Sequence, residues 1–130
     1  GAGWYGASKH ALEGISDALR LEMHRFGVQV VLVEPGLIRT GFESVADASM
    51  QTHCADPIWG SMMRKVSAGW SEGFRKGSSP DVVANTIATA LEADHPKARY
   101  RCGRESESVL VQRFMPTTLW DALVRKRMIG

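Results

Sequence analysis

The sequence is poor in the features that mark metal sites, disulfide scaffolds and membrane spans. It holds two cysteines, Cys54 and Cys102, which lack the spacing of a metal site, and we expect free thiols rather than a disulfide. Its four histidines are scattered, so we expect no metal. No stretch approaches the roughly 18 consecutive apolar residues that a membrane-spanning helix requires. No charged start is followed by an apolar run, so we expect no signal peptide.

Charge and composition are those of an ordinary soluble domain. The formal net charge is +2, which gives no reason to expect a nucleic-acid partner. Of the 130 residues, 44% are hydrophobic and 23% are charged. A single cytoplasmic domain is the expectation for a chain of this length and composition.

Two consecutive segments predict a helix followed by a buried strand. Over residues 5–25, apolar side chains recur at steps of three and four, which is typical of an amphipathic helix with a buried stripe. Gly27 follows at the position where helices commonly stop. Residues 28–34 are β-branched and almost continuously apolar, as in a central strand of a parallel sheet. Pro35 and Gly36 then end this strand.

The rest of the chain predicts more helices and one further strand. Residues 42–79 contain no strand signal, and we expect them to form a substrate-binding lid that includes a helix over 59–75. The remaining expected elements are a helix that starts at Ser79-Pro80-Asp81 and ends before His95-Pro96, a strand over 98–103, a helix over 105–114 and a last helix that opens at Pro116. Two parallel strands cannot cover their own faces and edges, so we expect residues 1–130 to be part of a larger α/β domain.

A tyrosine and a lysine lie four residues apart at the head of the first helix. Tyr5 and Lys9 therefore project from the same side of that helix. We expect both to continue the buried stripe, where an ammonium group requires a partner. A neighbouring ammonium lowers the pKa of a tyrosine, so the phenol can donate and accept a proton near neutral pH. The alternative is a tyrosine that only packs its ring and a lysine that reaches solvent.

Together, the two segments resemble a known family. Tyr5-Gly6-Ala7-Ser8-Lys9 resembles the Tyr-x-x-x-Lys motif of the short-chain dehydrogenases/reductases, and Pro35-Gly36-Leu37-Ile38-Arg39-Thr40 resembles that family's Pro-Gly-x-x-x-Thr motif. The resemblance continues through residues 79–84 and 99–103 and is weakest over the lid. It implies the C-terminal half of a Rossmann-like, doubly wound parallel sheet. The family's glycine-rich loop and its serine would lie upstream of this chain.

The resemblance implies an NAD(P)-dependent alcohol dehydrogenase or carbonyl reductase. Tyr5 would give a proton to a carbonyl oxygen or take one from an alcohol, and Lys9 would bind the ribose of NAD or NADP and support the tyrosine. The other residues implied to contact the cofactor are Pro35, Gly36, Leu37, Ile38 and Thr40. A homodimer or homotetramer is implied as well, and the isolated chain would be inactive.

Several interpretations of the remaining residues stay open. The lid side chains suit a bulky apolar substrate such as a steroid, retinoid or fatty-acyl carbonyl, or they only pack an amphipathic helix. These side chains are Met50, Trp59, Met62, Met63, Trp70 and Phe74. We interpret Arg99, Arg101 and Arg104 as charges of an edge strand. The protein could also be a nucleotide-sugar epimerase or dehydratase of the family's extended branch, or a truncated, non-enzymatic relative that binds a partner.

Overall fold

Six helices and two strands make up most of the part of the chain that the structure describes. The computed structural model describes residues 3–108, 111 and 114–128. Its elements are, in chain order, α1 (Gly3–Met23), the short 3-10 helix η1 (His24–Phe26), β1 (Leu32–Pro35), α2 (Phe42–Gln51), α3 (Gly60–Arg75), α4 (Pro80–Glu92), β2 (Arg99–Cys102) and α6 (Thr117–Met128).

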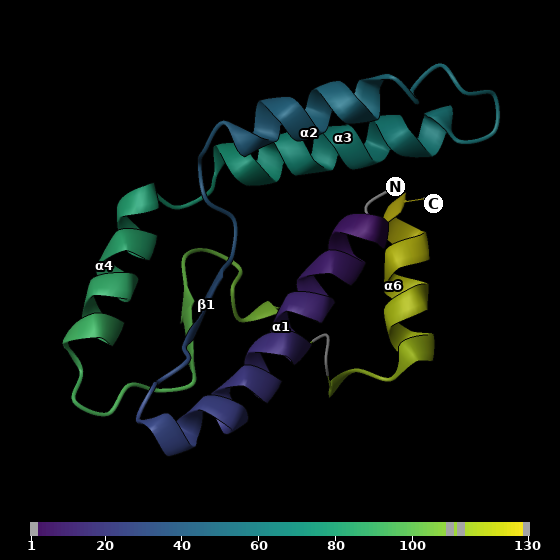
Figure 1. Cartoon of the computed structure of the whole chain (residues 1–130). Coiled ribbons are helices and arrows are strands. Elements are labelled where there is room, and N and C mark those ends of the chain that lie inside the picture. Colours follow the sequence, from purple (N-terminus) through teal and green to yellow (C-terminus); the bar gives the residue numbers. More distant parts are fainter. Residues whose placement is uncertain (1–2, 109–110, 112–113, 129–130) are drawn as a thin grey trace.

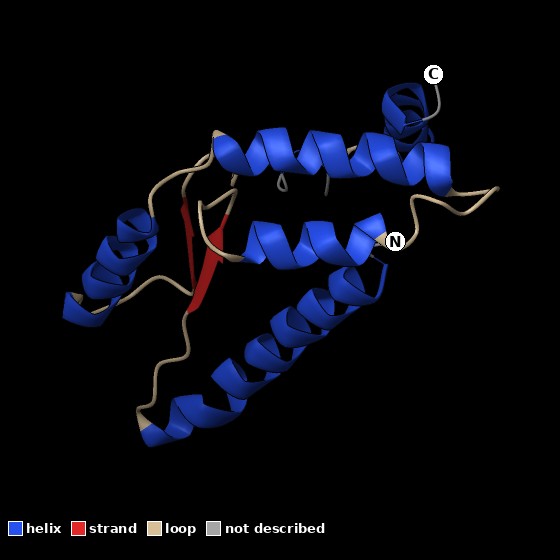
Figure 2. Cartoon of the chain, turned by 90° about the horizontal axis from the view of Figure 1, so that it is seen from above, coloured by secondary structure: helices blue, strands red, loops and turns tan. Residues whose placement is uncertain are grey.

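The two strands pair in parallel, which confirms the α/β fold class. Their register runs from Leu32 opposite Arg99 to Pro35 opposite Cys102. The expected strand over 28–34 begins later, because the chain first meets its neighbour where the Leu32 N–H binds the carbonyl of Ala98. In both views the strands lie between α4 and α1 (Figures 1 and 2). This arrangement of helices about a small parallel sheet is that of a partial Rossmann-like fold.

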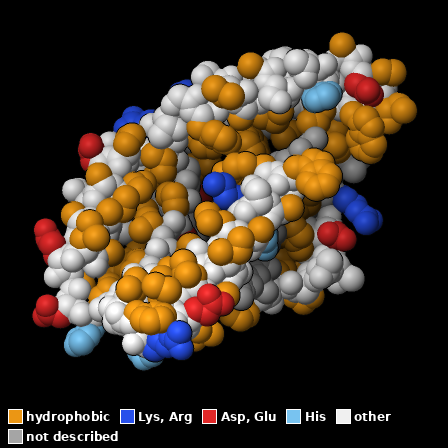
Figure 3. Space-filling view, in the orientation of Figure 1, with side chains coloured by type: hydrophobic (Ala, Val, Ile, Leu, Met, Phe, Trp, Pro, Cys, Tyr) orange, Lys and Arg blue, Asp and Glu red, His pale blue; other side chains and the backbone are white. Residues whose placement is uncertain are grey.

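Helix α1 forms where the sequence predicts it, but its apolar stripe is not buried. The helix ends through η1 at Gly27, which adopts a left-handed φ of 71° and donates its N–H to the carbonyl of His24. None of its residues is buried, and Leu12 and Ile15 are 51% and 65% exposed. Hydrophobic side chains accordingly gather along α1 on the surface (Figure 3). The expectation of a buried stripe is therefore wrong for the described residues, because a two-stranded sheet offers too little apolar surface to cover it.

Residues 42–79, which we expected to form a lid, contain two helices that lie side by side (Figure 1). Helix α3 confirms the helix expected over 59–75, whereas α2 was not expected. Met63 and Ser67 of α3 are buried. The hydroxyl of Ser67 donates a hydrogen bond to the carboxylate of Asp47 on α2. The two helices thus support each other.

The later elements follow the sequence closely. Ser79 caps α4, since its hydroxyl oxygen accepts a hydrogen bond from the Asp81 N–H at 3.3 Å, and the helix ends before His95. Strand β2 confirms the strand expected over 98–103, and α6 follows Pro116 as expected. Of the helix expected over 105–114, residues 105–107 form a turn, the backbone at 108, 111 and 114 is helical, and residues 109, 110, 112 and 113 lie outside the described part.

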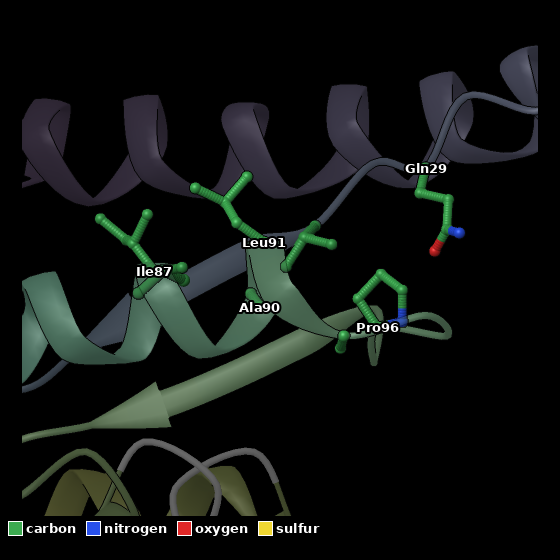
Figure 4. Close-up of a pocket in the computed structure, with 8 residues that line it drawn as sticks. Gln29, Ile87, Ala90, Leu91 and Pro96 are labelled. Atoms are coloured by element: carbon green, nitrogen blue, oxygen red, sulfur yellow. The ribbon is translucent and has the colours of Figure 1, made fainter.

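The buried apolar core is small. Among the described residues it consists of Ile38, Met63, Ala90 and Cys102. Beside it, a groove of about 560 Å³ opens between β1 and α4. In Figure 4, Ile87 and Leu91 project from α4 into this groove, and Pro96 stands towards one end. The apolar face of β1 is therefore only partly covered by α4.

Cys54 and Cys102 are both free thiols, as expected. Within the described residues, no helix is both long enough and apolar enough to cross a bilayer. The same residues bring no three His, Cys, Asp or Glu side chains together as a metal site would need.

Candidate active site

The tyrosine and the lysine stand together at the start of α1. The Nζ atom of Lys9 lies 5.4 Å from the centre of the Tyr5 ring, as expected for side chains four residues apart on a helix. Tyr5 is 47% exposed, so a ligand can reach this residue as well as water. The pair can present a proton-carrying oxygen and a positive charge to the same molecule.

The turn that follows β1 is hydrogen-bonded on both sides, to the end of β2 and to the residue before the cap of α4. On one side, the Gly36 N–H binds the carbonyl of Cys102, and the Leu37 N–H binds that of Arg104, both at 2.9 Å. On the other side, Ser78 exchanges two backbone hydrogen bonds with the stretch from Leu37 to Arg39. These bonds fix the backbone from Gly36 to Arg39 in one conformation. Among the described residues, no acceptor lies against the backbone N–H of Ile38, so this donor can serve a ligand.

Gly36 is required at this turn for reasons of space. A Cβ atom at this position would meet the backbone carbonyl oxygen of Arg104 well inside van der Waals contact, and the backbone N of Ser106 at 2.6 Å. Both obstacles belong to the backbone and cannot rotate away. The turn and the segment after β2 therefore approach as closely as they do because residue 36 has no side chain.

An aromatic contact brings the head of α1 to the end of this turn. The rings of Tyr5 and Phe42 lie 5.6 Å apart, and Phe42 is the first residue of α2. The Phe42 N–H donates to the Thr40 hydroxyl oxygen at 3.3 Å, so Phe42 follows the turn directly. Residues from two distant sequence motifs thus meet at one place in the structure.

Further aromatic rings continue from this meeting point into the lid. Phe42 lies 5.9 Å from Phe74, and Phe74 lies 5.9 Å from Trp70, with centres of rings as the reference points. Tyr5, Phe42, Phe74 and Trp70, which we call the aromatic row, connect α1 through α2 to α3. Phe42 was missed in the sequence, where the only signal was its place two residues after Thr40.

Charged side chains hold the other end of the turn. Glu34, the residue before Pro35, pairs with Arg99 at 2.9 Å and with Arg101 at 3.2 Å. Arg99 also binds Asp17 of α1 at 2.8 Å. The hydrogen bond from Arg99, and to a lesser extent the one from Arg20, lowers the pKa of Asp17 to about 2. Arg99 and Arg101 are therefore partners of acidic residues, and describing them as edge-strand charges was incomplete.

These features are those of a partial Rossmann-like α/β fold with a tyrosine–lysine pair close to the turn that follows a parallel strand. The sequence model of the family described as short chain dehydrogenase matches residues 1–51. The chain is 33% identical to the probable short-chain type dehydrogenase/reductase VdlC of Helicobacter pylori, over 98% of its own length and 47% of that protein. The chain belongs to the short-chain dehydrogenase/reductase family, as the two motifs indicated.

Two other relatives carry more specific names. Retinol dehydrogenase 7 of Mus musculus is 32% identical over 94% of this chain and 42% of its own length. The NADPH-dependent 3-dehydrocapnine reductase of Ornithobacterium rhinotracheale is 38% identical over 75% of this chain and 34% of its own length. The chain spans less than half the length of each of these curated relatives.

Proposed function

We propose that this chain carries the proton-transfer half of an NAD(P)-dependent dehydrogenase/reductase that interconverts an alcohol and a carbonyl group. The observation that carries the proposal is the contact between Tyr5 and Phe42, which brings the tyrosine–lysine pair to the end of the turn at Thr40. Ligands of open α/β sheets bind beyond the carboxyl ends of the strands, which is where this turn lies.

Tyr5 acts as the general acid and base in this proposal. In reduction, its phenol gives a proton to the substrate oxygen, and in oxidation its phenolate takes the proton of the alcohol. The Lys9 ammonium, held near the same ring, stabilises the negative charge that develops on the tyrosine oxygen. A positioned acid or base of this kind contributes roughly 10²–10⁴-fold to the rate.

The turn from Pro35 to Thr40 fits a nicotinamide cofactor. The tight approach at Gly36 holds the turn against the segment after β2, and the N–H of Ile38 is a free donor among the described residues. Backbone donors and acceptors of this kind can bind the carboxamide of the nicotinamide, with Leu37 beside it and the Thr40 hydroxyl next to them. When bound, NAD or NADP supplies or accepts the hydride. The name of one relative includes NADPH, which supports a nicotinamide cofactor here.

The aromatic row supports a bulky apolar substrate. Rings that lead from Tyr5 into the lid, residues 42–79, offer flat apolar surface beside the reacting group. The name of one relative includes retinol, a long apolar alcohol. We therefore propose that the lid selects an alcohol or carbonyl compound with a large apolar body.

We propose further that residues 1–130 work as the second half of a larger Rossmann-like domain. The groove beside β1 leaves an apolar strand face partly bare, as expected of a parallel sheet whose faces need further helices to cover them. The outward apolar residues of α1 support a homodimer or homotetramer through this helix.

The experiment is a comparison of the chain's two tyrosines in the full-length gene product. Oxidation of NADPH and NADH is followed by absorbance with a panel of aldehydes and ketones. Tyr5→Phe should lower kcat by roughly 10²-fold or more and leave cofactor binding nearly unchanged. Tyr100→Phe is the matched control and should keep wild-type turnover, because its hydroxyl only accepts the Lys97 N–H at 3.1 Å. Wild-type turnover by Tyr5→Phe would exclude the proposed role.

A further inference from the structure

A chain of charged side chains runs from α1 to the turn after β1. Asp17 on α1 binds the Nη2 atom of Arg99 at 2.8 Å, and the two residues are 82 positions apart in the sequence. The Nε atom of Arg99 lies 2.9 Å from Glu34, although its N–H is not aligned with that oxygen as a hydrogen bond, so the attraction there is one of charge. Glu34 is followed immediately by Pro35. One guanidinium thus bridges the helix that bears Tyr5 and the strand that leads into the turn.

This bridge acts where apolar packing is weak. Helix α1 has no buried residue, and its apolar side chains point outwards. The half-buried residues of α1 are mostly polar: Glu13, Ser16, Asp17 and Arg20, with Gly6 near one end and Met23 as the one apolar side chain among them. Apolar contacts slide easily, whereas the charged hydrogen bond from Arg99 to Asp17 fixes both distance and direction, and the charge of Glu34 holds the same guanidinium at the strand. The position of α1 relative to the sheet is therefore set by charge and geometry.

A small tilt of α1 at the bridge produces a larger displacement of Tyr5 at the start of the helix. Asp17 and Tyr5 are twelve residues apart, which corresponds to about 18 Å along a helix. A tilt of only about 3° at Asp17 would move Tyr5 by about 1 Å over that length. A displacement of about 1 Å in a catalytic group can cost on the order of 10²-fold in rate.

We infer that Asp17, Arg99 and Glu34 are positioning residues that hold α1, and with it Tyr5 and Lys9, in register with the turn from Pro35 to Thr40. The inference rests on the proposed function, because it concerns the alignment of the proton-transfer group with that turn. The bridge is partly exposed, with 41% of the Asp17 side chain and 26% of the Arg99 side chain accessible. Exposed ion pairs add little to stability. The loss of the bridge should therefore be seen in catalysis more than in folding.

The test uses Asp17→Asn and Arg99→Gln in the full-length gene product, singly and together. For each variant, kcat, the dissociation constant of NAD(P)H and the melting temperature are measured. Each single variant should lower kcat by about tenfold or more, while cofactor affinity changes by less than about threefold, because the turn keeps its own backbone bonds. The double variant should be no worse than the poorer single variant, since both changes break the same link.

Arg20→Gln is the matched control. Arg20 binds the other oxygen of the same Asp17 carboxylate at 2.8 Å and lies within α1, so it does not reach the sheet. Its kcat should stay within about twofold of wild type. Should Arg99→Gln fail to fold, Arg99→Lys replaces it. A lysine keeps the charge but cannot span both carboxylates with a rigid fork, so kcat should still fall.

Three results would overturn the inference. One is wild-type kcat in folded Asp17→Asn and Arg99→Gln, and a second is an equal loss of kcat in Arg20→Gln. The third is a double variant whose losses multiply, which would show that the two residues act separately. If Tyr5→Phe is inactive while the bridge variants are fully active, the positioning role alone fails. If the wild type transfers no hydride from NAD(P)H, the proposed function and this inference fail together.

Discussion

Helix α1 and the α2–α3 pair are both amphipathic in sequence, yet they are held in different ways. In the pair, Met63 and Ser67 are buried, and Ser71 donates a hydrogen bond to Glu43 at 2.8 Å across the helix contact. In α1 no residue is buried, and a bridge of charges to Arg99 ties the helix to the sheet. Helices α2 and α3 are close in the sequence, and each packs against the other. Helix α1, which bears Tyr5 and Lys9, has no such neighbouring α-helix close by in the sequence among the described residues.

This difference shows what an apolar stripe means. An apolar stripe in the sequence predicts that one side of a helix is buried, but it does not identify the element that packs against that side. For α2 and α3 the cover is the neighbouring helix. For α1 the described residues supply a polar contact on one side and leave the apolar side open, which suits a surface that meets another part or copy of the protein.

The turn that separates the two regions should give the largest effect. Gly36→Ala places a Cβ against the backbone of Arg104 and Ser106, which cannot yield without moving the loop after β2. We expect a loss of about 3 kcal/mol or more in the free energy of unfolding, together with loss of cofactor binding. Denaturant unfolding and NAD(P)H fluorescence measure the two effects.

Gly14→Ala is the control for this prediction. No atom lies within 4 Å of a Cβ built at Gly14 on α1, so the added methyl group meets open space. Alanine should then stabilise the helix by up to about 1 kcal/mol. Equal behaviour of the two variants would show that the close approach at Gly36 does not exist in solution.

Truncation of one buried side chain of α3 and one exposed side chain of α1 tests whether the two helices differ in burial. Met63 is 4% exposed and Leu12 is 51% exposed. Met63→Ala should cost about 2–3 kcal/mol in unfolding free energy. Leu12→Ala should change it by less than about 0.5 kcal/mol in a monomeric sample of this chain, where the stripe of α1 faces water. A cost for Leu12→Ala as large as that for Met63→Ala would mean that the stripe is covered.

The lid prediction concerns specificity. Phe42 stands between Tyr5 and Phe74 in the aromatic row, so Phe42→Ala should raise KM for long or ring-bearing carbonyl substrates by about tenfold and affect small aldehydes less. Phe26→Ala serves as the control, because Phe26 contacts Arg25 at the far end of α1. Equal changes of KM for large and small substrates in Phe42→Ala would contradict the assignment of the lid.

The sequence was most informative where the causes of structure are local. Ser79 and Pro80 predicted the start of α4, and Gly27 predicted the end of the first helical segment, because caps and turns depend on neighbouring residues. The four-residue spacing likewise placed Lys9 beside Tyr5.

The sequence was least informative where distant segments meet. Helix α2 is short and has no side-chain cap, and it forms against α3, which its own residues do not reveal. The partners of Arg99 lie in two other elements, and no local pattern indicates them. The contact of Phe42 with Tyr5 also depends on the path of the chain between them.

The smallest effect that we expect is on the pH dependence of stability. It concerns two carboxylates, Asp17 and Glu72, whose pKa is lowered to about 2. Asp17 is paired with Arg99 across the fold, while Glu72 is paired with Lys76 and Arg75 at the end of α3. Because the pKa of Asp17 is lower in the folded chain than in the unfolded one, its ion pairs stabilise the fold above about pH 4, and this stabilisation is lost as the pH falls towards 2.

Removing each carboxylate should separate the long-range pair from the local one. In Asp17→Asn, the fall in melting temperature between pH 5 and pH 2, read by circular dichroism across the ~4-to-2 window, should be smaller than in the wild type. Glu72→Gln should follow the wild-type curve more closely, because pairs three and four residues apart can persist in a helical turn of the unfolded chain, so the pKa of Glu72 changes less on unfolding. Reversed behaviour of the two variants would contradict the account of how α1 is held.

The central claim is that Tyr5, Lys9 and the turn ending at Thr40 form one site for a nicotinamide cofactor and its substrate. A crystal structure of the full-length gene product with bound NADP or NAD tests this claim most directly. We expect the Lys9 ammonium to lie within hydrogen-bond distance of the nicotinamide ribose and the Tyr5 hydroxyl to lie beside the hydride-bearing carbon. We expect the turn to contact the carboxamide. A cofactor bound elsewhere, with Tyr5 and Lys9 directed into solvent, would contradict it.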